Sequence, residues 1–191
     1  MNDRTIWFST LASDAARGQD VLAPMVRPLR PGTVVAGRAS TVRVMRDDNL
    51  DLRRAIVAGG LHGTVLVVAG GSESRAACMG GNIARELKDA GVIAVVTDAP
   101  VRDSVEIAAL GLPVWSRGVT PIKPEKMGGG GVAVDVELAG VNVRPGDWVI
   151  ADDDGIVIWP RDRLDELKTR AAELDRAEQQ AVNVDTDRLS G

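Results

Sequence analysis

Residues 92–103 read Val-Ile-Ala-Val-Val-Thr-Asp-Ala-Pro-Val-Arg-Asp, and this stretch is the most informative part of the chain. Its short, continuous apolar run predicts a strand buried in the core. The run ends in the charged pair Arg102-Asp103, shortly after a glycine-rich stretch that extends from Gly70-Gly71 to Gly80-Gly81-Asn82. The sequence therefore places a guanidinium beside a carboxylate at the exit of a buried strand, near a loop of free backbone amides.

This pair predicts a site for an anion and a metal ion. A guanidinium can bind a substrate carboxylate through two parallel hydrogen bonds, and an aspartate can hold a hard cation. One histidine and one cysteine cannot build a classical zinc site. The four lysines lie in polar or Gly/Pro-rich surroundings, which argues against imine chemistry. The expected cofactor is therefore Mg²⁺ or Mn²⁺ on Asp103, next to an enolate that the pair would stabilise.

The regions around this pair predict a strand–loop–helix–strand unit. A strand over residues 64–69 precedes the glycine-rich loop, Asn82 can cap a helix over residues 83–90, and the strand at 92–98 follows. Asp48-Asn49 can cap another helix that runs through Ala58. We also expect helices from Ser9 or Thr10 to Arg17, from Asp20 to the residue before Pro28, and from Asp103 onward, with strands at 34–45, 113–119, 132–138, 148–151 and 155–159.

The C-terminal region predicts one long amphipathic helix. From Arg161 onward apolar residues recur at three- and four-residue spacing on an otherwise charged helix, and this apolar stripe consists of Leu164, Leu167, Ala171, Leu174, Ala177 and Ala181. The partner of this stripe can be another subunit. The length suits a single domain, with residues 1–160 as its α/β body and residues 161–191 as a C-terminal helix and tail of the same domain.

Several classes of partner are excluded by composition. The net charge of −4 and the lack of a Lys/Arg run argue against nucleic acid. No apolar stretch is long enough to span a membrane, and no signal-peptide core follows the first residues. We therefore expect a cytoplasmic protein.

Simpler structural roles compete with a functional site. Asp103 and Glu106, three residues apart, also fit a helix capping box, which needs no metal ion. Arg102 could form a surface salt bridge, which would contribute little to stability. Asp152-Asp153-Asp154-Gly155 lacks the spacing of a calcium loop and predicts a turn between strands. Cys78 is expected to be a small buried packing residue.

Taken in chain order, a set of motifs resembles the RraA-like family, which contains the 4-hydroxy-4-methyl-2-oxoglutarate / 4-carboxy-4-hydroxy-2-oxoadipate aldolases and the regulator of RNase E activity. The resemblance implies an α/β fold of packed β-sheets with flanking helices, and a homotrimer or hexamer with sites between subunits. The motifs are Ser9-Thr10 with Ser13-Asp14-Ala15, Asp48-Asn49-Leu50, Val67-Val68-Ala69-Gly70-Gly71, Gly80-Gly81-Asn82, Val101-Arg102-Asp103, Pro113-Val114 with Arg117-Gly118, and Ala151-Asp152-Asp153-Asp154-Gly155.

The aldolase branch of this family implies a role for each site residue. Arg102 would bind the pyruvyl carboxylate, Asp103 would hold Mg²⁺, and Glu178 would reach the site from the C-terminal helix of a neighbouring subunit. The loop of Gly80, Gly81, Asn82 and Ile83 would bind substrate through backbone amides. The catalytic set implied by the resemblance is therefore Arg102, Asp103 and Glu178.

One position departs from the aldolase motif. Gly81 stands twenty-one positions before Arg102, where the motif has an acid. The resemblance implies a metal-dependent lyase on short 2-oxo dicarboxylates, by aldol cleavage of 4-hydroxy-2-oxo acids or by oxaloacetate-type decarboxylation. Without that acid we expect decarboxylation to be favoured, unless Glu86 or Asp98 substitutes. The alternative is a non-catalytic RraA-type regulator that binds a ribonuclease, but that branch typically lacks the Asp of the pair, so Asp103 favours an enzyme.

Overall fold

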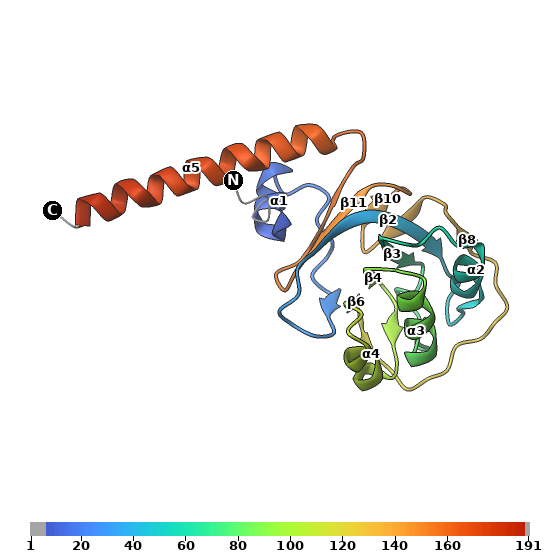
Figure 1. Ribbon diagram of the computed structural model, residues 1–191. Coiled ribbons are helices and arrows are strands. Elements are labelled where there is room, and N and C mark those ends of the chain that lie inside the picture. The colour runs from blue at the N-terminus through green and yellow to red at the C-terminus, as the bar shows by residue number, and fades with distance from the viewer. Residues whose placement is uncertain (1–6, 190–191) are drawn as a thin grey trace.

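The computed structural model describes residues 7–189, which fold into a curved mixed sheet with helices on one face and a long C-terminal helix (Figure 1). Its elements, in chain order, are α1 (Ser9–Ala15), β1 (Arg27–Pro28), β2 (Val35–Arg43), α2 (Leu50–Ala58), β3 (Thr64–Ala69), α3 (Gly81–Asp89), β4 (Ala94–Thr97), β5 (Pro100–Val101), α4 (Ser104–Leu110), β6 (Val114–Ser116), β7 (Gly118–Val119), β8 (Gly131–Val132), β9 (Val136–Leu138), β10 (Val141–Val143), β11 (Trp148–Ala151), β12 (Ile156–Trp159) and α5 (Leu164–Leu189).

The main sheet has the strand order β1-β6-β4-β3-β2-β11-β12, and β8 also pairs with β2. Its centre is parallel, because β2 pairs with β3, β3 with β4 and β4 with β6 in the same direction. The added strands β1, β8, β11 and β12 are antiparallel. The parallel strands are joined through α2, α3 and α4, as parallel pairs require crossover connections.

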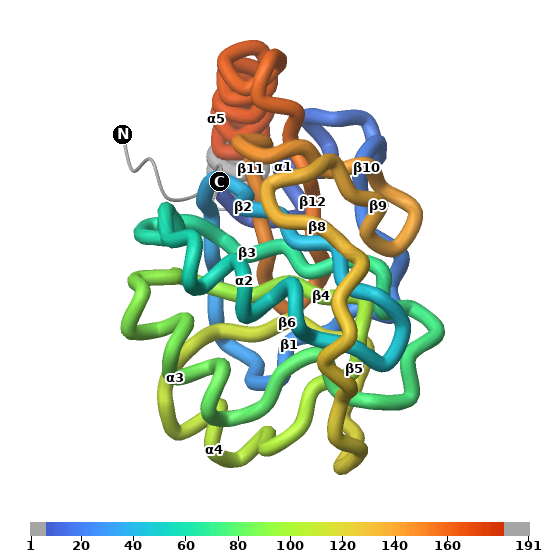
Figure 2. Tube along the Cα trace, turned by 90° about the vertical axis from the view of Figure 1, so that its right-hand side faces the viewer, coloured from blue at the N-terminus to red at the C-terminus, as the bar shows by residue number. Residues whose placement is uncertain are grey.

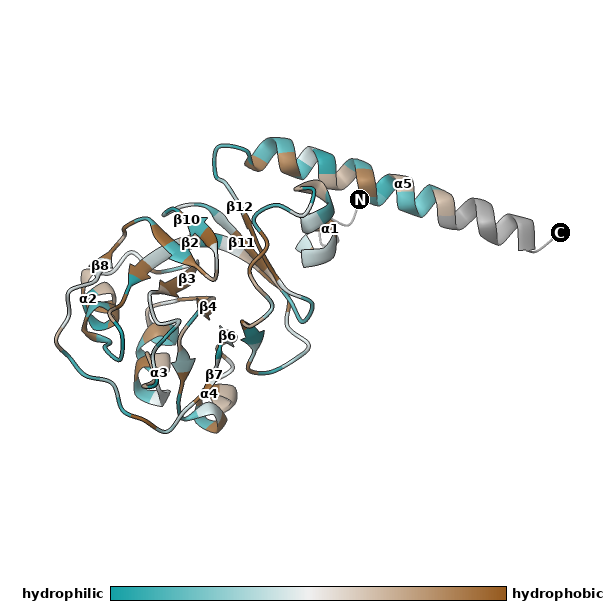
Figure 3. Ribbon diagram, turned by 180° about the vertical axis from the view of Figure 1, so that it is seen from behind, coloured by the Kyte–Doolittle hydropathy of each residue, from teal (hydrophilic) through white to brown (hydrophobic). Residues whose placement is uncertain are grey.

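One face of the sheet is covered by these three helices. α3 turns Ile83, Ala84 and Leu87 toward the strands, and these residues join one hydrophobic cluster with the buried side chains of β3 and β4. β3 and β4 are buried along nearly their whole length, which explains their continuous apolar sequences. Figure 3 shows β3 and β12 in brown, as apolar strands.

The opposite face of the sheet is covered by a small second sheet. β9 and β10 form an antiparallel hairpin whose inward residues, among them Leu138 and Val143, pack against Val65 and Val67 of β3. Figure 2 shows this hairpin on one side of the main sheet and α3 on the other. The expected packed sheets with flanking helices are confirmed.

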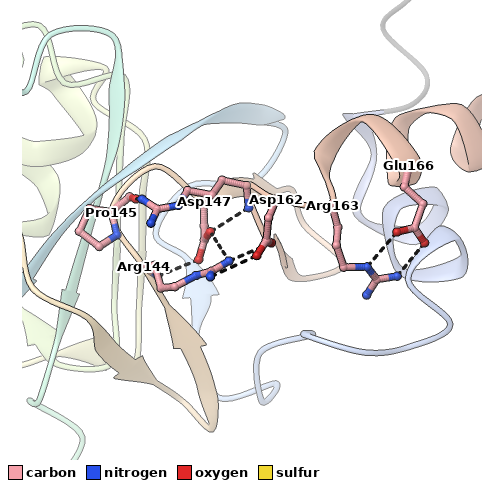
Figure 4. Close-up of polar contacts among 7 residues, drawn as sticks. Arg144, Pro145, Asp147, Asp162, Arg163 and Glu166 are labelled. Carbon is pink, nitrogen blue, oxygen red and sulfur yellow. Dashed lines mark hydrogen bonds and ion pairs between the residues drawn. The ribbon is translucent and has the colours of Figure 1, made fainter.

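Hydrogen bonds around Asp147 fix the segment that precedes α5, and α5 packs on α1. The buried Asp147 carboxylate accepts the amides of Arg144 (2.8 Å) and Arg161 (2.9 Å), and the Arg144 guanidinium also reaches Asp162 at 3.0 Å (Figure 4). The first half of α5 buries Leu167 and Ala171 in a cluster with α1, β11 and β12. The second half extends beyond α1, away from the sheet (Figure 1), and from residue 176 to residue 181 its side chains are exposed. No helix among residues 7–189 combines the length and the apolar character needed to cross a membrane.

Several sequence-based expectations about elements are wrong. The strands expected at 113–119 and 132–138 are each divided between two sheets, because β6 and β8 belong to the main sheet whereas β7 pairs with β5 and β9 pairs with β10. The helix expected from Asp20 does not form, because Val21 instead bridges to Val157 and Arg27–Pro28 pairs with β6. Asn82 lies inside α3 and Gly80 occupies the N-cap position, so Asn82 is not the cap of this helix. The strands expected at 64–69 and 148–151 and the helix after Asp48-Asn49 are confirmed, as is the turn at Asp152–Gly155 between β11 and β12.

Candidate functional site

A short parallel pairing between β5 and the segment at Met79 places Arg102 beside the glycine-rich loop. β5 follows the buried β4, and its Val101 bridges to Met79. The amide of Arg102 donates to the carbonyl of Met79 at 3.0 Å, and the amide of Cys78 donates to the carbonyl of Pro100 at 2.9 Å. These bonds lay residues 78–81 directly beside Arg102, so the structure brings together the two segments that the sequence singled out.

Asp103 adopts a backbone conformation that is unusual for a residue with a side chain. It has φ 57° and ψ 40°, in the left-handed region, at the N-cap position of α4. Its carboxylate makes no capping bond to α4; Oδ2 instead accepts the amide of Gly81 at 3.1 Å and lies 3.6 Å from Nε of Arg102. The capping-box interpretation of Asp103 is therefore wrong. The side chain is turned away from its own helix and toward the loop that precedes α3.

Gly80 and Gly81 are required by the close approach of these side chains. A Cβ atom on Gly80 would lie 2.5 Å from Oδ2 of Asp103 and 2.9 Å from Cγ and Nε of Arg102. A Cβ atom on Gly81 would lie 2.2 Å from Oε2 of Glu106. Real Cβ atoms do not approach other atoms so closely, so the two glycines make room for three charged side chains.

The Glu106 carboxylate fills the space where a side chain at position 81 would project. Glu106 lies in the first turn of α4, is half-buried, and accepts a hydrogen bond from Nη2 of Arg85 at 2.7 Å. Sequence reasoning treated Glu106 only as a capping partner. The signal that could have identified it is its spacing, because residues three apart on a helix lie on the same face and Asp103 and Glu106 both carry carboxylates.

The two acids that the sequence offered as substitutes for a side chain at Gly81 have other roles. Glu86 lies 3.3 Å from Nη1 of Arg53. Asp98 accepts the amides of Gly70 (3.2 Å) and Gly71 (2.9 Å), and burial raises its pKa above the ordinary value in spite of these bonds. Asp98 therefore holds the loop after β3, and Glu106 is the carboxylate next to Gly81.

The site residues line two adjoining depressions. A cavity of about 220 Å³ is lined by Gly80, Asn82, Ile83, Arg102 and Asp103, among others. A broader cleft on the other side of Arg102 and Asp103 is lined by Glu106, Val119 and Thr120. The amides of Asn82 and Ile83 belong to the first turn of α3, where no preceding carbonyl of the helix can accept them. They are free to donate to an anionic ligand.

The groups that could hold a metal ion are few. Among the described residues no three His, Cys, Asp or Glu side chains gather in one place. Asp103 has an exposed carboxylate at the edge of the cavity. A single carboxylate of this kind suits Mg²⁺ or Mn²⁺, which often keep several waters and take further oxygens from the substrate.

Glu178 lies apart from the Arg102–Asp103 site, and Cys78 is buried beneath the loop of that site. Glu178 is exposed on the projecting half of α5, on the side of the molecule away from α3 and α4 (Figures 1 and 2). Cys78 is buried beneath the loop, and burial raises the pKa of its thiol to about 12. The expectation that Cys78 is a small buried packing residue is confirmed.

The fold and the site define an α/β protein with an Arg-Asp pair facing a glycine-rich helix start, and comparison with known proteins gives the family. A model described as RraA-like, Aldolase/RraA, matches residues 9–158, and the chain belongs to this family. It is 31% identical over 179 residues to a Halalkalibacterium halodurans protein named "Putative 4-hydroxy-4-methyl-2-oxoglutarate aldolase", with 92% of this chain and 84% of that one covered. An Alkalilimnicola ehrlichii protein of the same name is 38% identical over 148 residues, with coverages of 78% and 91%.

The structural comparison agrees with the sequence comparison. The crystal structure of Streptomyces coelicolor RraAS2, described as an unusual member of the RNase ES inhibitor RraA protein family, superimposes with a TM-score of 0.83 at 27% identity. The match covers 93% of this chain and 94% of that one. The family therefore includes relatives named as aldolases and relatives named as inhibitors of a ribonuclease.

Proposed function

We propose that this protein is a divalent-metal-dependent lyase that acts on short 2-oxo dicarboxylates and releases pyruvate. The observation that carries the proposal is the left-handed Asp103, whose carboxylate is withheld from its own helix and faces the loop of Gly80 and Gly81 beside Arg102. Aspartate tolerates the left-handed conformation better than most residues do. Here that conformation accompanies a carboxylate directed to the loop instead of to the first turn of its own helix. The names of the aldolase relatives support the same reaction class.

Each residue of the site has a proposed task. Arg102 binds the carboxylate of the 2-oxo acid group through its guanidinium fork, and the amides of Asn82 and Ile83 donate to the same end of the substrate. Asp103 holds Mg²⁺ or Mn²⁺ through its carboxylate. A bound cation would supply positive charge that stabilises an enolate. Arg102 and the loop amides add to this stabilisation without having to reorganise.

Glu106 is the proposed proton-transfer residue. Aldol cleavage requires a base that removes the proton from the substrate hydroxyl, whereas decarboxylation needs only stabilisation of the enolate. The acid expected at position 81 is absent, but the Glu106 carboxylate occupies the adjacent space and is oriented by Arg85. This arrangement removes the reason to expect a strong preference for decarboxylation, and we propose that both reactions are available to the site.

The active unit is proposed to be a homo-oligomer, a trimer or hexamer, in which α5 reaches a neighbouring subunit. The support is the projection of the second half of α5 beyond α1, where nothing in the described chain covers Ala177 or Ala181 of the apolar stripe. Glu178 lies on this half and cannot serve the site of its own subunit from there. It is proposed to complete the site of a neighbour.

A release assay separates this proposal from the regulatory alternative, which the likeness to RraAS2 favours. The purified protein is supplied with 4-hydroxy-4-methyl-2-oxoglutarate or oxaloacetate, with Mg²⁺ or with excess EDTA, and pyruvate is measured. We expect pyruvate release that requires the added metal ion. No release above the uncatalysed rate from either acid would contradict the lyase and favour a non-catalytic protein that binds a ribonuclease.

A further inference from the structure

The cavity beside Arg102 concentrates positive charge in a protein that is acidic overall. Four basic side chains line it, whereas Asp103 is the only carboxylate in its lining. The basic residues are Arg53, Arg102, Lys123 and Lys126. Because the whole chain has a net charge of −4, this clustering is not a consequence of a generally basic surface. Arg53 also pairs with Glu86 at 3.3 Å and Arg102 lies 3.6 Å from Asp103, so the excess positive charge of the lining comes from Lys123 and Lys126. The cavity therefore attracts an anion with more charge than Arg102 alone would bind.

The two lysines lie on a segment that is anchored to the start of α2. The amide of Asn49 donates to the carbonyl of Glu125 at 3.2 Å. The buried Asp48 carboxylate accepts the amides of Met127 and Gly128, the latter at 3.1 Å. These bonds fix the backbone between and beside the lysines. No ion-pair partner of either lysine occurs in the described part of the chain.

Two of the residues that line the cavity each have a buried polar atom without a hydrogen-bond partner among the described residues. These atoms are Nε of Arg53, a donor, and Oδ1 of Asn49, an acceptor. Asn49 is only 4% exposed, and its Nδ2 already donates to the carbonyl of Cys78 at 3.0 Å, so Oδ1 is the end left without a donor. Buried polar groups are usually paired. The residues around the cavity therefore retain polar groups that the described chain does not pair.

We propose that this cavity binds the carboxylate of the substrate that is remote from its 2-oxo acid group, with Lys123, Lys126 and Arg53 as the residues that select a second carboxylate. The inference rests on the proposed function, because that function places the near end of the substrate on Arg102. The remote carboxylate then lies in the cavity, where charge-assisted hydrogen bonds to cations are stronger than those between neutral groups.

The test compares two ligands that differ only in the remote carboxylate. 2-Oxoglutarate and 2-oxopentanoate have the same chain length, and the second has a methyl group in place of the carboxylate. Neither has a 4-hydroxyl group or a carboxylate β to the oxo group, so calorimetric titration in the presence of Mg²⁺ reports binding without turnover. We expect 2-oxoglutarate to bind about tenfold more tightly or better, on the scale of one charge-assisted contact.

Variants then assign the preference to the lysines. The double variant Lys123→Gln with Lys126→Gln should bring the two affinities close together by weakening 2-oxoglutarate alone. Lys88→Gln is the matched control, because Lys88 lies on α3 outside the cavity and donates to the carbonyl of Leu110. It should leave the ratio unchanged.

The possible results separate this inference from the function on which it rests. Equal affinities of the wild-type protein for the two acids would overturn the subsite and leave the lyase proposal intact. If the ratio of the affinities for 2-oxoglutarate and 2-oxopentanoate is the same in the double variant as in the wild type, the assignment to the lysines is overturned. Failure of both acids to bind would overturn the subsite together with the proposed site for 2-oxo acids.

Discussion

The carboxylate of Asp103 accepts the amide of Gly81, 3.1 Å away, although Asp103 stands at the start of a different helix. One residue at the N-terminus of α4 therefore binds the first amide of α3. This contact joins the two segments that carry the candidate site, and it leaves the first turn of α4 without a side-chain cap. α4 therefore lacks the stabilisation that a side-chain cap would contribute. The Asp103 carboxylate is instead held beside Gly81.

Substitutions at Gly81 test whether Glu106 occupies the place of a missing acid. Gly81→Ala would put its Cβ against the Glu106 carboxylate, which is the mobile end of a side chain and can move aside. We expect a folded protein whose cleavage of 4-hydroxy-4-methyl-2-oxoglutarate falls tenfold or more, the loss of a positioned proton-transfer group being worth about a hundredfold. Gly81→Asp should retain more activity than Gly81→Ala, because it returns a carboxylate to the same region. Equal cleavage rates for wild type and Gly81→Ala would remove Glu106 from the mechanism.

Glu106→Gln tests the proton-transfer role by comparing two substrates. The amide keeps the shape of the side chain but cannot act as a base. We expect kcat for cleavage of the 4-hydroxy acid to fall about a hundredfold and kcat for oxaloacetate decarboxylation to fall much less, since only the first reaction requires a base. Arg85→Gln, which removes the partner that orients Glu106, should produce a smaller change in the same direction. A parallel fall in both reactions would indicate a structural role.

Local patterns predicted the elements better than they predicted the full site. β3 and β11 match their expected ranges because their residues are buried on both faces and the apolar runs show this directly. The helix expected from Asp20 fails because Val21 and Arg27 find partners in distant strands, and such tertiary pairing overrides local propensity.

The residues of the site likewise divide into those that the sequence could place together and those that it could not. Arg102 and Asp103 and the loop 80–83 could be paired from the sequence because a single strand–loop–helix–strand unit carries them. Arg53 and the two lysines of the cavity come from α2 and from the segment after β7, which meet only once the chain is folded. Their spacing in the sequence gives no sign of the cavity that they share.

Asp48 is expected to stabilise the protein in a pH-dependent way. Burial opposes its ionisation, but hydrogen bonds from the amides of Leu50, Met127 and Gly128 lower its pKa below the ordinary 3.8. A group with a lowered pKa contributes stability above its unfolded pKa and loses it as the pH falls through its folded pKa. Asp48→Asn should therefore reduce the free energy of unfolding by about 1–3 kcal/mol at pH 7, because the new NH₂ group leaves a buried amide without an acceptor.

Urea unfolding followed by tryptophan fluorescence at steps from pH 7 to pH 3.5 measures this effect. The difference between wild type and Asp48→Asn should be constant near neutral pH and should narrow below about pH 4. Asp154→Asn, at an exposed position in the β11–β12 turn, is the matched control and should change stability little. A difference that does not depend on pH would contradict the ionised state assigned to Asp48.

Complementation between two inactive variants tests whether Glu178 serves a neighbouring subunit. Asp103→Asn and Glu178→Gln should each reduce activity strongly when expressed alone. Co-expressed with different tags and purified through both tags, they should form mixed oligomers in which some sites combine an intact Asp103 with an intact Glu178. Random assembly across a head-to-tail interface would restore about a quarter of the sites. Mixed oligomers as inactive as each variant alone, or an active wild-type monomer, would contradict the shared site.

The most direct measurement of the central claim is the Mg²⁺ dependence of pyruvate release by wild type and Asp103→Asn. Asparagine tolerates the left-handed conformation and can still accept the Gly81 amide, so the variant should fold with wild-type stability. The account predicts that wild-type release is abolished by EDTA and restored by Mg²⁺ or Mn²⁺, and that Asp103→Asn shows at least a hundredfold lower release at every metal concentration. Full turnover of wild type in EDTA, or turnover of Asp103→Asn equal to that of wild type, would contradict the account.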